Sequence, residues 1–212
     1  KTYLTSSAPS PIVISAEGGM LTLRGFDLPL FVIRNRNELN DIHEWLVKSK
    51  EPDKYETVCI DSLSEIAEVL LAEEKKVVND PRQAYGIMSD LMNEAIRGFR
   101  DLPKHTLFTA KTRKLIDDTT QRITYMPSVP GQALLNNLPY FFDEVFLLRF
   151  GTVNKVKNVR HIQTVGDHQY ICKDRSGKLN REEPPHTGNI INKILDIPVK
   201  PAGAPAKPST GE

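Results

Sequence analysis

Short apolar runs that alternate with segments of helical periodicity constrain the fold of this chain more than any other feature of its sequence. Four runs have the length and composition of buried strands, at residues 11–15, 28–33, 55–60 and 105–109. Between them, apolar residues recur at spacings of three and four, as in Leu39/Ile42/Leu46, Leu63/Ile66/Val69/Leu70 and Ile87/Leu91/Ala95. Because parallel strands need long crossover connections, this alternation predicts an α/β fold with a mostly parallel sheet.

Two of the expected helices begin with residues that are typical of helix caps. Ser62, followed three residues later by Glu65, has the form of a capping box. Asp80 precedes Pro81, which predicts an N-cap with proline at the first helical position. We therefore expect helices to begin at these two points.

The pattern changes after about residue 140 to closely spaced strand-like runs, at residues 144–148, 159–165 and 169–172. Gly166-Asp167 separates the last two runs in the manner of a hairpin. We expect an antiparallel extension at the edge of the parallel sheet. Residues 198–212 lack large apolar side chains, which predicts a core over residues 1–197 followed by a disordered tail rich in proline and alanine.

The composition favours a cytoplasmic protein over a membrane or secreted one. No apolar run approaches the roughly 20 residues that a membrane span needs, and the first residues have no signal-peptide pattern. Two cysteines are too few for a disulfide scaffold, and the five histidines show no zinc-site spacing.

The net charge of +1 conceals an uneven distribution along the chain. Residues 1–100 carry a net charge of −4, whereas residues 101–181 carry +6. A basic half of this kind is either a solvated surface or a binding site for a polyanion.

Polar side chains follow three of the expected parallel strands, at the sheet edge where such folds bind ligands. Glu17 follows the first of these strands, Asp61 the third, and Thr109 with Lys111 the fourth. Asp61 has the position of a Walker B aspartate, which holds a nucleotide-bound Mg²⁺. An aspartate at a strand end also commonly caps the next helix, and that alternative stays open here.

Lys1-Thr2 corresponds to the last two residues of a P-loop, because a helix-like segment follows it directly. In such a loop the lysine neutralises phosphates and the threonine hydroxyl binds Mg²⁺. The glycines and the strand that precede these residues in a P-loop are not in this sequence. The alternative is a chain end without functional meaning.

The order of these parts along the chain resembles that of the small RecA-like P-loop ATPases of bacteriophages. These are nucleotide-binding or AAA-type proteins, and some act as single-strand annealing recombinases. The resemblance extends to about residue 197, and the segments that carry it are Lys1-Thr2, residues 15–19, 60–63, 99–105 and 173–178. It implies a RecA-like core that uses ATP and Mg²⁺ in the cytoplasm of a bacterial host.

The resemblance also assigns roles in the nucleotide site. It makes Glu17 the general base that deprotonates the attacking water. Nucleotide-binding residues would be Lys1, Thr2, Thr109 and Lys111, and Mg²⁺ ligands would be Thr2 and Asp61. The sequence departs from RecA itself after the fourth strand, where it lacks the amide side chain that senses the γ-phosphate.

The polar segment over residues 111–127 occupies the position of the second DNA-binding loop of RecA-like proteins. Its cations would neutralise phosphates and its tyrosine would stack on a base, through Lys111, Arg113, Lys114, Arg122 and Tyr125. Asp117-Asp118 weakens the positive field, and an exposed hairpin with solvated charges is the alternative.

Lys173-Asp174-Arg175 resembles the Lys-x-Arg element that RecA-like and DnaB-like assemblies insert into the active site of a neighbouring subunit. Lys173 and Arg175 would then act in catalysis, because an arginine supplied by a neighbour stabilises charge on the transferring phosphoryl group. The element implies self-association into a ring or filament. A basic β-turn on the surface is the alternative.

Together these features predict an ATP hydrolase, provided that the intact protein carries the rest of the P-loop. The expected function is a single-stranded-DNA-binding recombinase that promotes annealing or strand exchange in phage recombination. Two alternatives stay open, a nucleic-acid-binding scaffold that does not hydrolyse ATP and a ring-forming helicase-like ATPase. The tail is a candidate contact for a single-strand-binding protein.

Overall fold

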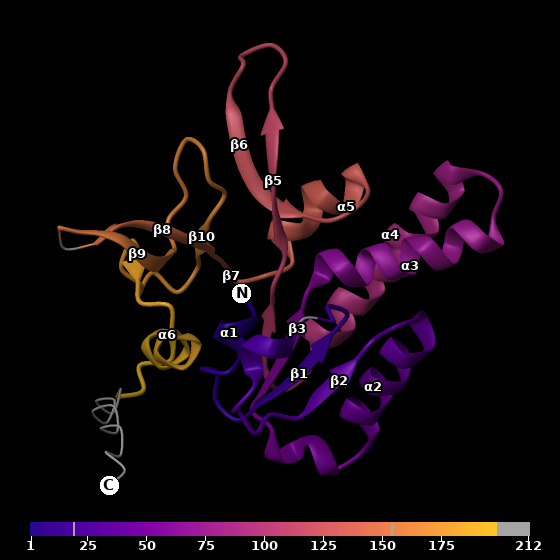
Figure 1. The fold of residues 1–212 in the computed structure, drawn as a ribbon, viewed down its shortest axis with the longest axis horizontal. Coiled ribbons are helices and arrows are strands. Elements are labelled where there is room, and N and C mark those ends of the chain that lie inside the picture. The colour runs from indigo at the N-terminus through magenta and orange to yellow at the C-terminus, as the bar shows by residue number, and fades with distance from the viewer. Residues whose placement is uncertain (19, 154, 199–212) are drawn as a thin grey trace, which may run out of the picture.

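A four-stranded parallel sheet organises the first half of the chain. The computed structural model describes residues 1–18, 20–153 and 155–198, and Figure 1 shows the arrangement of its elements. The strand order is β2-β1-β3-β4, with strands β1 (Pro11–Ser15), β2 (Leu30–Val32), β3 (Thr57–Asp61) and β4 (His105–Phe108). The α/β fold class with a parallel sheet is therefore confirmed, although β2 is shorter than the apolar run around it.

Three long helices connect these strands, namely α2 (Arg36–Lys48), α3 (Leu63–Val77) and α4 (Pro81–Arg100). Figure 1 shows them to the right of the sheet. The Asp80 carboxylate accepts a hydrogen bond from the backbone N–H of Arg82, which confirms the expected cap of α4. The capping box of α3 is wrong, because the Ser62 hydroxyl bonds to a distant carboxylate and not to the helix.

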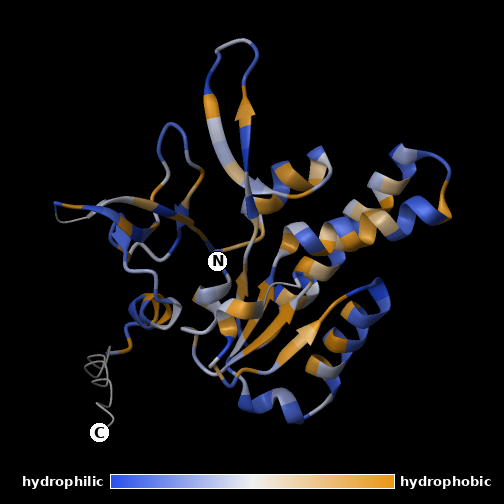
Figure 2. Cartoon of the chain, in the orientation of Figure 1, coloured by the Kyte–Doolittle hydropathy of each residue, from blue (hydrophilic) through white to orange (hydrophobic). Residues whose placement is uncertain are grey.

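The main hydrophobic core lies between the sheet and these helices. Strands β1 and β3 are buried along their whole length, as continuous apolar runs of a parallel sheet require. Figure 2 shows the strands as hydrophobic and the helices as mixed, with apolar residues along part of each helix. The largest fully buried side chains include Phe99, Met88, Met92, Leu134 and Leu138.

The remaining elements follow β4 or connect the main ones. The strands are β5 (Lys111–Ile116), β6 (Ile123–Ser128), β7 (Glu144–Val145), β8 (Leu147–Val153), β9 (Val156–Gln163), β10 (Lys173–Asp174) and β11 (Glu182–Glu183). The helices are α1 (Thr2–Thr5), α5 (Gln132–Asn137) and α6 (Thr187–Ile194), with 3-10 turns at Met20–Leu23, Glu51–Lys54 and Leu138–Tyr140.

The antiparallel strands confirm the predicted change of pattern, but they do not extend the parallel sheet. They form small sheets of their own, β5-β6, β7-β10 and β8-β9-β11. The expected hairpin at Gly166-Asp167 is also wrong. Residues 169–172 form no strand, because the backbone of Tyr170 bridges instead to Tyr125 on β6.

The first and last helices contact each other through hydrogen bonds. The Thr187 hydroxyl donates to the Leu4 carbonyl at 2.9 Å, and the backbone N–H of Gly188 donates to the Ser7 carbonyl at 2.8 Å. Two residues at the start of α6 thus donate to carbonyls in and just after α1, and the Leu4 carbonyl also accepts from the backbone N–H and the hydroxyl of Ser7. This contact holds α1 against the C-terminal part of the molecule.

Replacing Gly188 with alanine is expected to lower the free energy of unfolding by ~1–3 kcal/mol, because a side chain there overpacks the contact. A Cβ atom at this position would lie 2.8 Å from the Ser7 carbonyl oxygen. Urea unfolding measures the change. The matched control is Gly86→Ala in α4, where a Cβ meets no atom within 4 Å and helix propensity predicts a gain of ~0.5–1 kcal/mol. Equal stability of Gly188→Ala and the wild type would contradict the prediction.

Within the described ranges, no helix is long and apolar enough to cross a membrane. The predicted tail begins at Pro198, and its residues 199–212 lie outside the described part of the chain.

Candidate functional site

The carboxyl ends of β1, β3 and β4 bring three polar residues to one edge of the sheet. Asp61 is the last residue of β3, Glu17 follows β1, and Thr109 follows β4. Because Ser15 pairs with Asp61 in register, and β4 runs parallel beside β3, these strand ends are neighbours. Helix α1 begins at the same edge and supplies Lys1 and Thr2.

Asp61 lies at the centre of this cluster and is fully buried. Its Oδ2 accepts a hydrogen bond from the Thr2 hydroxyl at 2.6 Å, and its Oδ1 accepts one from the Thr109 hydroxyl. The Lys1 ammonium lies 3.8 Å from Oδ1. Two hydroxyls and one cation therefore surround the buried charge, as burial of a carboxylate requires.

Glu17 is partly exposed beside Asp61 and accepts two hydrogen bonds on its Oε1. The Lys1 ammonium donates at 3.0 Å and the Ser62 hydroxyl at 2.7 Å. Desolvation raises the pKa of Glu17, but the hydrogen bonds from Ser62 and Lys1 outweigh it, and the pKa lies below its usual value. Glu17 is therefore ionised at neutral pH.

Lys1 links the two carboxylates, with its side chain about one-third exposed. A cation held between an exposed and a buried carboxylate is available to a phosphate that approaches from solvent. The structure thus brings together Lys1, Thr2, Glu17, Asp61 and Thr109, the residues that we expected in the nucleotide site. Sequence reasoning missed the role of Ser62, whose position directly after Asp61 was its only signal.

The donor set of the cluster fits a nucleotide with Mg²⁺. Mg²⁺ prefers oxygen ligands and is commonly held by one or two protein oxygens together with phosphates and water. The Thr2 hydroxyl and the Asp61 carboxylate supply such oxygens side by side. Within the described residues, no group of three or more His, Cys, Asp or Glu side chains is placed to hold a metal ion.

Lys111 forms no hydrogen bond with the described residues around Asp61. Its ammonium forms an ion pair with Glu65 at 2.7 Å on the exposed surface, while its backbone N–H donates to the Ser64 hydroxyl at 2.8 Å. A cleft of about 780 Å³ lies alongside β4, and its lining includes Lys1, Thr109 and Lys111. The expected role of Lys111 at the nucleotide therefore requires its pair with Glu65 to open.

The predicted DNA-binding segment forms the β5-β6 hairpin, and its contact with DNA stays a prediction. Arg113 and Lys114 are exposed on β5. The Arg122 guanidinium donates to the His168 carbonyl at 3.0 Å. Tyr125 is half-buried, and its ring stacks on Tyr170 with centroids 5.1 Å apart.

Lys173 and Arg175 lie in and beside β10, away from the cluster around Asp61. The Lys173 ammonium donates to the Pro139 carbonyl at 2.8 Å, and Arg175 forms an ion pair with Asp143 at 2.9 Å. Arg175 is nevertheless about two-thirds exposed. Arg175 thus lies on the surface and Lys173 is partly buried, and their expected role toward a neighbouring subunit stays a prediction.

Comparison with known families matches residues 1–176 to the model of the AAA domain. No curated protein matches the chain significantly. The match includes the strand ends, helix α1 and the Lys173-Asp174-Arg175 turn. Because it covers most of the chain, the protein belongs to the AAA domain family and carries an ATPase domain of the P-loop type.

Proposed function

We propose that this protein is an ATP- and Mg²⁺-dependent, RecA-like recombinase that binds single-stranded DNA and promotes annealing or strand exchange during phage recombination. The observation that carries the proposal is the convergence of Lys1, Thr2, Glu17 and Asp61 at one edge of the parallel sheet. A cation, a hydroxyl and two carboxylates with different surroundings are side chains that P-loop enzymes use to hydrolyse a nucleoside triphosphate, together with the backbone of the glycine loop.

Each residue of the cluster has a distinct task in this reaction. Lys1 turns from Glu17 to the phosphates and neutralises their charge. Thr2 and Asp61 would hold Mg²⁺, which would supply Lewis-acid stabilisation of the phosphate charge. Oε2 of Glu17 accepts no hydrogen bond from the described residues, so it is available to a water molecule.

The reaction itself is a transfer of the γ-phosphoryl group to water. The water oxygen bonds to the γ-phosphorus while the bond to the ADP oxygen breaks, and ADP leaves with that electron pair. Glu17 accepts the proton of the water. Arg175 of a neighbouring subunit would stabilise charge on the transferring group, which makes turnover depend on assembly.

The DNA contact of this proposal rests on the β5-β6 hairpin. Arg113 and Lys114 are exposed there and form no ion pair with any described carboxylate. Lys111 is paired with Glu65, and one face of Tyr125 is covered by Tyr170. We therefore assign the phosphate contacts of this hairpin mainly to Arg113 and Lys114.

The test measures ATP hydrolysis by the intact protein with and without single-stranded DNA. DNA should stimulate turnover, and the double variant Arg113→Ser/Lys114→Ser should need more DNA for half-maximal stimulation. For this variant, the slope of log binding constant against log salt concentration should fall in magnitude by ~0.7 per lost phosphate contact. Lys76→Ser/Arg82→Ser removes two exposed cations from the helical side and is the matched control.

The result also separates the proposal from its alternatives. DNA binding without ATP turnover would leave a scaffold that does not hydrolyse ATP. Closed rings in negative-stain images without DNA would favour a ring-forming ATPase. If the rate of ATP hydrolysis is the same with and without DNA, and the protein binds no DNA, the recombinase proposal is overturned and an ATPase remains.

A further inference from the structure

The β8-β9 hairpin is a second basic surface, apart from the one that the function above uses. Residues 147–163 contain Arg149, Lys155, Lys157 and Arg160 and no aspartate or glutamate. Lys155, Lys157 and Arg160 are exposed. A two-stranded ribbon with four cations and no carboxylate carries a strong local positive potential.

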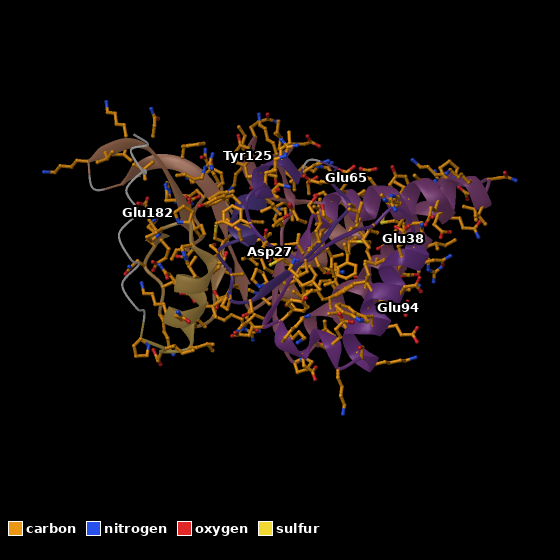
Figure 3. The ribbon with its side chains drawn as sticks, turned by 60° about the horizontal axis from the view of Figure 1, so that its bottom comes forward. Asp27, Glu38, Glu65, Glu94, Tyr125 and Glu182 are labelled. Atoms are coloured by element: carbon orange, nitrogen blue, oxygen red, sulfur yellow. The ribbon has the colours of Figure 1, made fainter. Side chains whose placement is uncertain are left out.

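These cations are not neutralised by neighbouring carboxylates. Across the described ranges, none of the four forms an ion pair, and Arg149 instead donates to the amide oxygen of Gln163 at 2.9 Å. The acidic side chain at the base of the hairpin is Glu182, which lies 3.8 Å from His161. Figure 3 shows Glu38 and Glu94 over the helices, on the other side of the molecule from the C-terminal strands.

An aromatic ring accompanies the cations on this hairpin. Phe150 is 59% exposed and pairs in register with Arg160, whose guanidinium carbon lies 4.9 Å from the ring centroid. Exposure of most of a phenylalanine side chain leaves apolar area in water. Cations beside an accessible aromatic ring form the type of surface that binds single strands without reading their sequence.

The comparison with β5-β6 favours β8-β9 as the stronger site for a polyanion. The tip of β5-β6 carries Asp117 and Asp118. Hydrogen bonds from the backbone and hydroxyl of Thr120 hold the pKa of Asp117 below its usual value, so this tip is negative at neutral pH. The β8-β9 hairpin has no such opposing charge.

The two hairpins are also physically connected. Tyr125 of β6 stacks on Tyr170, and the Arg149 guanidinium of β8 lies 4.8 Å from the centroid of the Tyr170 ring. Figure 1 shows both hairpins extending away from the parallel sheet. The base of β8-β9 thus adjoins β5-β6 through Tyr170 and Arg149, while Phe150 and Arg160 point to the opposite face of the hairpin.

We propose that the β8-β9 hairpin binds single-stranded nucleic acid, with Lys155, Lys157 and Arg160 on phosphates and Phe150 stacked on a base. This inference rests on the proposed function, because it adds a second contact to the same strand. In the described part of the chain, Lys155 and Lys157 form no cation–π contact with the ring, whereas Arg160 lies over it, so a lysine variant and a Phe150 variant give the surface two distinct signatures in a binding experiment.

The experiment measures binding of a fluorescent oligothymidylate to the intact protein by anisotropy at several salt concentrations, without ATP. Lys155→Ser/Lys157→Ser should weaken binding at low salt. It should also lower the magnitude of the slope of log affinity against log salt concentration by ~1.4, or ~0.7 per phosphate contact. Phe150→Ala should weaken binding by ~5-fold to 100-fold and leave the salt slope unchanged. Lys76→Ser/Arg82→Ser is the control of equal charge and should match the wild type.

The outcomes separate this inference from the proposed function. If the wild type binds no oligonucleotide either without ATP or with ATP and Mg²⁺, the proposed function itself fails. If the Arg113→Ser/Lys114→Ser variant is weakened while both β8-β9 variants bind as the wild type does, the hairpin inference is overturned and the proposed function stands. Loss of binding to phosphatidylserine vesicles in the β8-β9 variants, with binding of the oligonucleotide unchanged, would also overturn it.

Discussion

Replacing Glu17 with glutamine is expected to lower kcat for ATP hydrolysis by ~10²-fold to 10⁴-fold, the range that general base catalysis contributes. The amide cannot accept the proton of the attacking water, yet it retains the shape of the carboxylate and can accept the Ser62 hydrogen bond. The affinity for ATP should be unchanged or slightly higher, because Lys1 loses a competing carboxylate. Single-turnover hydrolysis and nucleotide titration measure the two effects separately.

The pKa of Glu17 adds a pH signature to this prediction. Because hydrogen bonds from Ser62 and Lys1 place the pKa of Glu17 in the free protein below its usual value, kcat/KM should be unchanged from neutral pH into mild acid. It should fall only as the pH drops through the lowered pKa and the base becomes protonated. Glu94→Gln on exposed α4 is the control, and a Glu17→Gln enzyme with wild-type kcat would disprove the assignment.

Asp61→Asn is expected to abolish most Mg²⁺-dependent turnover, by ~10²-fold or more, because metal stabilisation of transition-state charge is worth several kcal/mol. The variant loses the buried negative charge beside the Thr2 hydroxyl. Binding of ATP without Mg²⁺ should be retained or tighter, since a charge that repels phosphate is removed. Titration of ATP with and without Mg²⁺ measures the difference.

The stability of this second variant requires its own control. The asparagine side chain keeps one oxygen to accept a hydroxyl hydrogen bond, but its amide nitrogen must face Thr2 or Thr109. Thermal unfolding shows whether the fold survives the change. Asp90→Asn on the exposed side of α4 should affect neither property. Equal loss of ATP affinity with and without Mg²⁺ would contradict a metal-binding role.

Much of the parallel sheet was predictable from the sequence because its signal is local. A strand that is buried on both faces must be apolar at each position, and β1 and β3 satisfy that requirement over five residues each. The cap at Asp80 was predictable for the same reason, since its partner is two residues away. Parallel strands then placed Glu17, Asp61 and Thr109 at one edge through topology alone.

Long-range contacts account for the predictions that failed. Ser62 has the sequence of a cap, but its hydroxyl donates a charge-assisted hydrogen bond to the Glu17 carboxylate. It accepts no hydrogen bond from the N–H groups of α3. The run over residues 169–172 has the composition of a strand, yet its backbone pairs with Tyr125 from a distant part of the chain. The pair between Lys111 and Glu65 had no signal, because the two residues are 46 positions apart.

The contact between the first and last helices has a consequence for how the molecule is made. Leu4 and Thr187 lie 183 positions apart, and a loop of that length closes slowly and at an entropic cost. Synthesis proceeds from the N-terminus, so the sheet can assemble while α6 is still inside the ribosome. The Leu4 carbonyl already accepts from the N–H and hydroxyl of Ser7, and it gains the Thr187 hydroxyl as a further donor only when translation reaches α6. The contact that joins α1 to the C-terminal part of the molecule therefore forms among the last steps of folding.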